Sequence, residues 1–119
     1  MIGNGLSLTL RKCEVDISND IEKIKDFINN IINLIDMKPL GSIIIRKGSE
    51  HLPGYSAVQI IETSHIALHT FSKNNSYMFG IESCKSFDMG ELYTFIIDFL
   101  KCKDSRINAD YKIVMEGVD

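Results

Sequence analysis

The chain has 119 residues, with 13 Lys and Arg against 16 Asp and Glu, for a formal net charge of −3 at pH 7. This length suits one domain around one core, and 45% hydrophobic with 24% charged residues excludes a disordered or coiled-coil protein. Because the basic residues are scattered among acids, nucleic acid and anionic membranes are not expected as partners.

The apolar runs are short, and none approaches the roughly 20 residues of a membrane span. The N-terminus lacks a basic segment ahead of an apolar one, so neither a membrane anchor nor export is expected. The cysteines Cys13, Cys84 and Cys102 include no Cys-x-x-Cys pair, which argues against a disulfide framework or a cysteine-rich zinc site. We therefore expect a soluble protein of the reducing cytoplasm.

The first predicted element is a strand, because leucines alternate with polar residues over residues 6–11. A helix is predicted next, with Ser18 or Asn19 as its cap, since Glu22 follows Asn19 by three residues. Its apolar stripe recurs at steps of three and four, in Ile21, Ile24, Ile28, Ile31 and Ile35, and it should end near Met37.

Proline and glycine break the chain after this helix, at Pro39 and Gly41, and residues 42–46 are predicted to form a second strand. A polar surface loop is expected over residues 47–54. Strand-like segments then follow, separated by a turn candidate at residues 72–75; they cover residues 55–63, 66–71 and 76–83.

The second predicted helix begins after Asp88, which has Glu91 three residues later. Its apolar face comprises Leu92, Phe95, Ile96, Phe99 and Leu100. After a polar loop, alternation over residues 109–115 predicts the last strand. The order β-α-β-strands-α-β indicates an α+β, two-layer sandwich: one domain over residues 1–119, with a mostly antiparallel sheet and two helices on one face.

Two kinds of cofactor site can be weighed from short motifs. The Gly-x-Gly at Gly3 and Gly5 precedes the predicted strand and lacks the third glycine, so we predict no dinucleotide site. His65 and His69 would share one face of a strand, and Cys84 could add a third zinc ligand. Partly buried histidines bonded to the backbone are the more common outcome, and we predict no metal.

The richest segment for chemistry runs over residues 54–84, where hydroxyls, an imidazole and a thiol interrupt apolar strands. A serine hydrolase built on Ser64 and His69 would still need an orienting acid and an oxyanion hole, and Gly-x-Ser-x-Gly is absent. Cys84 alone is more often a small buried hydrophobe than a nucleophile. None of these residues predicts catalysis singly.

Together they resemble a family pattern. Gly54-x-Ser56, then Thr63-Ser64-His65-Ile66-Ala67-Leu68-His69-Thr70, then Cys84, is similar to the core of the prokaryotic S-adenosylmethionine decarboxylases, which are pyruvoyl-dependent and self-processing. The family typically shows Gly-x-Ser, Glu-Ser-His-x-x-x-His-Thr and a cysteine at the same distance downstream.

The resemblance implies that the chain is cleaved between Thr63 and Ser64. Ser64 would attack the carbonyl of Thr63, and elimination from the resulting ester would leave a pyruvoyl cofactor on residues 64–119, which forms a Schiff base with the substrate amine. His69 would be the processing base, Cys84 the proton donor after decarboxylation, and Ser56 a hydrogen-bonding support. A regular strand puts Ser64 and His69 on opposite faces, so we expect a bulge or turn at residues 63–65.

The implied activity is decarboxylation of S-adenosylmethionine for the synthesis of spermidine and other polyamines, by a homodimer with sites near its subunit boundary. Phe71-Ser72-Lys73 stands where the family has Trp-Pro-Glu, and Cys84 is followed by Lys85 in place of glycine. These departures leave open a pyruvoyl-dependent decarboxylase of arginine or ornithine. Thr63, in place of glutamate, also leaves open an unprocessed, non-catalytic binding module.

Overall fold

The computed structural model describes residues 1–118 and forms one antiparallel sheet with two helices. Every neighbouring pair in the sheet, whose order is β2-β3-β4-β5-β1-β6, is antiparallel. The elements are, in chain order, β1 (Ile2–Cys13), α1 (Ile21–Leu34), β2 (Ile44–Lys47), β3 (Tyr55–Ile61), β4 (Ser64–Phe71), β5 (Ser76–Ser83), α2 (Met89–Leu100) and β6 (Cys102–Val114).

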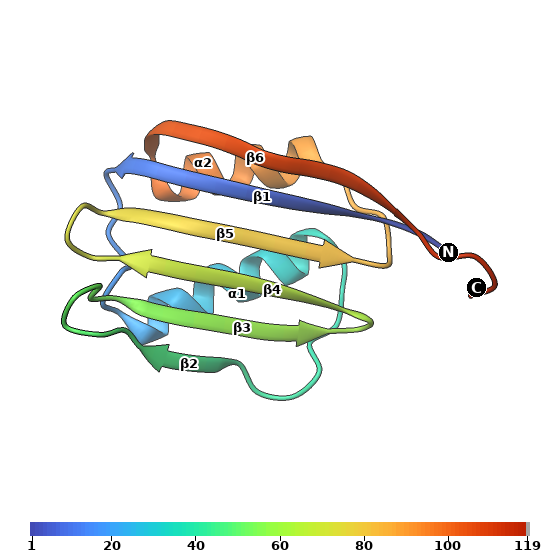
Figure 1. The fold of residues 1–119 in the computed structure, drawn as a ribbon, viewed down its shortest axis with the longest axis horizontal. Coiled ribbons are helices and arrows are strands. Elements are labelled where there is room, and N and C mark those ends of the chain that lie inside the picture. Colours follow the sequence, from blue (N-terminus) through green and yellow to red (C-terminus); the bar gives the residue numbers. More distant parts are fainter. Residues whose placement is uncertain (119) are drawn as a thin grey trace.

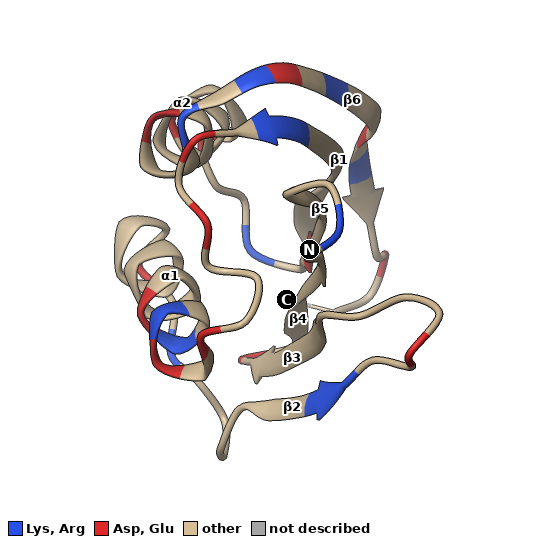
Figure 2. Cartoon of the chain, turned by 90° about the vertical axis from the view of Figure 1, so that its left-hand side faces the viewer, with Lys and Arg blue, Asp and Glu red and all other residues tan. Residues whose placement is uncertain are grey.

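Both helices cover the same face of the sheet (Figures 1 and 2). The core lies between the two layers, where alternate residues of the strands meet the apolar stripes of α1 and α2. On β4, for example, Ile66 and Leu68 are fully buried while His65 and His69 point to the other face. The predicted α+β two-layer sandwich is therefore confirmed.

The helix caps agree with the sequence at one helix and differ at the other. Asp88 caps α2 as predicted, accepting the backbone N–H of Glu91 at 2.9 Å. Asp20, rather than Ser18 or Asn19, caps α1. Ser18 is fully buried, and its hydroxyl donates to the carboxylate of Asp16, so it is turned away from the start of the helix.

Two neighbouring strands, β1 and the edge strand β6, are longer than predicted. β1 begins at Ile2, so Gly3 and Gly5 lie inside the strand rather than before it. A side chain at Gly5 would collide with the ring of Tyr111 on β6. β6 begins at Cys102 because Lys101 takes a left-handed conformation that reverses the chain directly after α2. The polar loop predicted there is part of an exposed edge strand.

The second face of the sheet has no helix over it (Figure 2). Exposed apolar side chains on it come from strands across the sheet: Ile44, Ile60, Met78 and Tyr111. Tyr111 donates a hydrogen bond to the carboxylate of Glu82 on the same face. Neither helix within residues 1–118 combines the length and the apolar character needed to cross a bilayer.

Candidate active site

A two-residue turn joins β3 to β4 where cleavage is predicted. Ile61 pairs directly with Ser64, so only Glu62 and Thr63 lie between the strands. Thr63 has a φ of 56°, a left-handed conformation that is costly for a β-branched residue. The backbone N–H of Glu62 donates to the carbonyl of Lys38, which ties the turn to the segment after α1. The distortion therefore lies at the residue before the predicted scissile bond.

Ser64 is held beside Cys84 at this end of the sheet. The hydroxyl oxygen of Ser64 accepts the backbone N–H of Cys84 at 2.9 Å. Cys84 directly follows β5, which is the neighbour of β4, so the fold brings the two residues together across 20 positions of sequence. We call Thr63, Ser64 and Cys84 the turn end.

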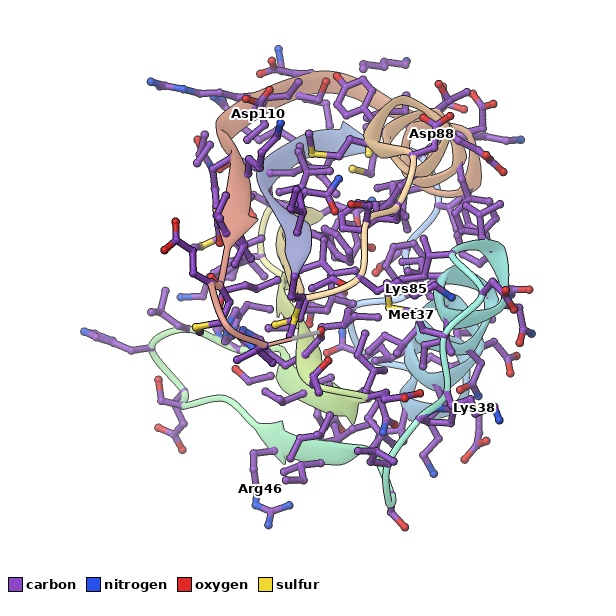
Figure 3. All side chains as sticks on the ribbon, turned by 90° about the vertical axis from the view of Figure 1, so that its right-hand side faces the viewer. Met37, Lys38, Arg46, Lys85, Asp88 and Asp110 are labelled. Atoms are coloured by element: carbon purple, nitrogen blue, oxygen red, sulfur yellow. The ribbon has the colours of Figure 1, made fainter. Side chains whose placement is uncertain are left out.

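The chain around Cys84 is anchored by its neighbours. The buried hydroxyl of Ser83 accepts the backbone N–H of Lys85 at 3.0 Å. The ammonium of Lys85 donates to the carbonyl of Asp36 at 2.7 Å and lies 3.8 Å from the Asp36 carboxylate. Figure 3 shows Lys85 beside Met37, on the side of the molecule occupied by α1. These contacts link the thiol segment to the end of that helix.

A cavity of about 310 Å³ adjoins the turn end. Its volume is at the lower limit for ligand pockets in proteins. Its lining contains Thr63 and Cys84 of the motif, together with charged residues and one methionine: Asp36, Met37, Lys38, Glu62 and Lys85. The charged residues come from three separate segments, and only the tertiary structure places them together.

Ser56 and His69 meet at the opposite end of β3 and β4. They face each other across the two strands, and the Ser56 hydroxyl lies 2.8 Å from Nδ1 of His69. Both side chains are partly exposed on the sheet face without helices. We call Ser56 and His69, together with Gly54 and Thr70, the histidine end.

Close backbone contact explains the glycine of the Gly54-x-Ser56 motif. A Cβ atom at Gly54 would lie 2.0 Å from the carbonyl oxygen of Thr70. Thr70 is buried; its hydroxyl accepts the N–H of Tyr55 at 2.9 Å and donates to the carbonyl of Ser18 at 2.8 Å. The motif contains Thr70 but gives it no role. Its contacts show that it holds the backbone in place at this end of the hairpin.

Of the bulge or turn predicted at residues 63–65, the structure has a turn, at Glu62 and Thr63, and no bulge. Because this turn precedes Ser64, it does not bring Ser64 and His69 onto one face. Pairing of β3 with β4 runs without a register shift from Ser64 to His69, and the only departure is the turn before Ser64. The two side chains therefore point to opposite faces. Five residues of strand separate them by about 17 Å. Within one chain, His69 does not reach Ser64.

Two further features of the sequence are its candidate metal ligands and Lys73, which departs from the family pattern. Within residues 1–118, no three side chains of His, Cys, Asp or Glu gather closely enough to bind a metal ion. Lys73 lies in the turn after β4, at the same end as His69, where its ammonium donates to the carbonyl of His51 at 3.3 Å. In a single chain it therefore lies away from Ser64.

Comparison with known proteins identifies the family. An adenosylmethionine decarboxylase from Aquifex aeolicus VF5 has a similar structure, with a TM-score of 0.73 at 18% sequence identity, over 99% of this chain and 97% of that one. No match was found among curated proteins. The family model described as S-adenosylmethionine decarboxylase matches residues 5–111, nearly the whole chain. The chain therefore belongs to the S-adenosylmethionine decarboxylase family.

Proposed function

We propose that this protein is a self-processing decarboxylase of S-adenosylmethionine that provides the decarboxylated product for polyamine synthesis. Family membership favours this substrate over arginine or ornithine. The observation that carries the proposal is the turn end, where Ser64 follows a residue in a left-handed conformation and its hydroxyl is fixed beside Cys84.

The first step is cleavage between Thr63 and Ser64. The Cys84 N–H occupies one acceptor position of the Ser64 oxygen, which leaves the hydroxyl hydrogen free for removal and a second lone pair free for attack. Attack on the Thr63 carbonyl converts the amide into an ester. Rearrangement also releases the left-handed Thr63 from its turn, so backbone strain of roughly 1–3 kcal/mol favours the step.

Loss of the α-proton of Ser64 would then expel the Thr63 carboxylate and leave dehydroalanine at position 64. Water would hydrolyse its imine tautomer, releasing ammonia and leaving a pyruvoyl group on residues 64–119. Ser64 supplies the carbon skeleton of this group and water supplies its ketone oxygen, so the residues present fit its formation. When present, this group would supply an electron sink for the carbon that loses carbon dioxide. The chain's own residues position the substrate and move the protons.

A base is needed for proton removal, and we assign it to His69 of a second copy of the chain. Imidazole is partly neutral near pH 7, which suits it to this task. Because His69 lies about 17 Å from Ser64 along the strand, it cannot reach the Ser64 of its own chain. A homodimer formed through the uncovered sheet face would bring the histidine end of one chain toward the turn end of the other.

Two features of that face support the dimer. Apolar side chains there are left uncovered, including Ile60, which is 51% exposed, and Met78, which is 47% exposed. Ser56 and His69 lie among these residues on the same face, since His69 pairs with Met78. Burying such a surface between two copies removes apolar area from water.

Cys84 is proposed to return the proton to the substrate after carbon dioxide leaves. Cys84 and Thr63 both line the 310 Å³ cavity, so a substrate held there would lie beside both residues. Two carboxylates in the lining, Asp36 and Glu62, suit a cationic sulfonium, although Asp36 is already paired with Lys85. Glu62 is therefore our choice for attracting the positive charge of the substrate.

Intact-mass measurement of the purified protein tests the proposal. The wild-type chain should split between Thr63 and Ser64 during incubation at neutral pH and should release carbon dioxide from S-adenosylmethionine. Ser64→Ala should abolish both, whereas Ser42→Ala, in the exposed linker before β2, should change neither. A wild-type chain that stays in one piece and contains no carbonyl reactive toward a hydrazine would instead support a non-catalytic binding module.

A further inference from the structure

A pair of thiols lies outside the proposed active site, where the end of β1 meets the start of β6. Cys13 and Cys102 are opposite each other in the antiparallel register of these strands. Their Sγ atoms are 2.6 Å apart, and both cysteines are free thiols. Cys13 is buried and Cys102 is partly exposed.

The backbone geometry at this pair is compatible with a covalent bond. Opposite residues of antiparallel strands have Cα atoms about 4.5–5.5 Å apart, within the range of about 4.4–6.8 Å found across disulfides. The sulfur atoms need to approach by only about half an ångström to reach the S–S bond length of about 2.05 Å. Bond formation therefore requires no rearrangement of the strands.

We propose that Cys13 and Cys102 form a reversible disulfide when the protein meets a disulfide oxidant. The partly exposed thiolate of Cys102 attacks a small disulfide, forms a mixed disulfide and releases one small thiolate. The thiolate of Cys13 then attacks Sγ of Cys102 and releases the second. The two protons lost by the cysteines pass to the two released thiolates, so two protein thiols are oxidised as one small disulfide is reduced.

The surroundings determine how fast this exchange runs. Burial and the neighbouring sulfur raise the pKa of Cys13 well above its ordinary value, and burial raises the pKa of Cys102. The thiolate is the attacking species, so exchange is slow at neutral pH and speeds up as the pH rises. Cys84, at the far end of the sheet, is not opposite either thiol.

The cross-link has a special consequence if the chain is cleaved, and this part rests on the proposed function. Cys13 lies in residues 1–63 and Cys102 in residues 64–119. Cleavage after Thr63 leaves these two fragments associated only through the sheet and the core. The disulfide would join them covalently again without touching Ser64 or Cys84.

The test treats wild type and Ser64→Ala with oxidised glutathione at pH 8.5. In both proteins, titratable thiols under denaturing conditions should fall from three to one, with loss of two hydrogen atoms in the intact mass. The thermal midpoint of Ser64→Ala should rise by about 10 °C, because the link closes a long loop in the intact chain. If wild type is cleaved, non-reducing electrophoresis should show one joined species that a reductant separates.

Variants locate the bond. Cys102→Ser should prevent the loss of thiols and the thermal shift, whereas Cys84→Ser should keep both. Three remaining thiols in wild type after prolonged oxidation, or a bond that requires Cys84, would overturn the proposal. Because Ser64→Ala is scored by thiol count and thermal midpoint, the result does not depend on cleavage.

Discussion

The turn end and the histidine end of the β3–β4 hairpin are built differently. At the turn end, Thr63 is held in a left-handed conformation by a two-residue turn, next to a charged cavity. At the histidine end, Thr70 uses its hydroxyl twice to support the backbone beneath the Ser56–His69 pair. One end has a strained residue and the proposed nucleophile, and the other has the proposed base on a well-supported backbone. Each end has what the other lacks, which is why we assign them to one site shared between two chains.

The strongest test of this division uses two inactive variants in one dimer. His69→Ala and Cys84→Ala should each lower decarboxylation by at least about 10²-fold, since each removes a proton-transfer group. A mixed dimer, purified through different tags on the two chains, contains one site with both defects and one with neither. It should recover about half of the wild-type activity.

Mass spectrometry of the mixed dimer sharpens the same comparison. The chain that carries His69→Ala should be cleaved, because its partner supplies the histidine, and the chain that carries Cys84→Ala should remain intact. A differently tagged dimer with His69→Ala in both chains is the control and should stay whole. If the mixed dimer is as inactive as its parents, the two ends act within one chain and the shared site is wrong.

Gly54→Ala should damage the histidine end alone. The added Cβ would lie 2.0 Å from the Thr70 carbonyl, at a φ of 141° that side chains rarely adopt. We expect a loss of about 2–3 kcal/mol in the free energy of unfolding, measured by urea denaturation. Gly90→Ala is the matched control, because its Cβ would meet only the Asp88 carboxylate at 3.4 Å. Equal losses of unfolding free energy in the two variants would show that the contact at Gly54 does not require glycine.

Tyr77→Phe tests the support beneath the histidine end. Tyr77 pairs with Thr70, is fully buried, and accepts the N–H of Ile17 at 2.9 Å while its hydroxyl donates to the carbonyl of Val15 at 3.1 Å. Removing the hydroxyl leaves the buried N–H of Ile17 unpaired and should lower the free energy of unfolding by about 1–3 kcal/mol at pH 7.

The same variant gives a pH dependence. Burial raises the pKa of Tyr77 from 10.0 to about 12, so the folded state holds the proton more tightly than the unfolded chain. The protonated Tyr77 hydroxyl therefore makes its full contribution to the free energy of unfolding below pH 10. This contribution is lost as the pH rises toward and through 12. The stability difference between wild type and Tyr77→Phe should therefore shrink in urea titrations between these values. A constant difference would contradict the assignment.

Thr63→Gly should have the smallest effect of these variants, a slower cleavage at the turn end. Glycine adopts a positive φ without strain, so the variant should fold at least as stably while cleavage slows by about tenfold, equivalent to about 1.4 kcal/mol of released strain. Thr63→Val keeps the branched Cβ and loses only the hydroxyl, which donates to the Glu62 carbonyl, and should cleave at nearly the wild-type rate. Unchanged cleavage in Thr63→Gly would show that strain plays no part.

Much of the architecture could be predicted from hydrophobic periodicity. The stripes of both helices and the alternation in β5 follow directly from burial on one face, and the Asp88 cap follows from local chemistry. The sequence does not single out Asp20, because Ser18 is an equally good capping residue. Ser18 is unable to cap the helix because it is buried by contacts with Asp16 and with Thr70, which is 52 positions away. β6 was placed too late because an exposed edge strand needs no apolar alternation.

The site divides in the same way between local and tertiary information. The residue types in the Ser56, Ser64, His69 and Cys84 pattern, and hence the chemistry proposed for them, are readable in the sequence. Their arrangement depends on one turn: once Ile61 pairs with Ser64, Ser56 must face His69, and Ser64 must lie on the other face of the sheet. Pairing register, the open sheet face and the Cys13–Cys102 contact are decided by strands far apart in sequence, so only the tertiary structure could specify them.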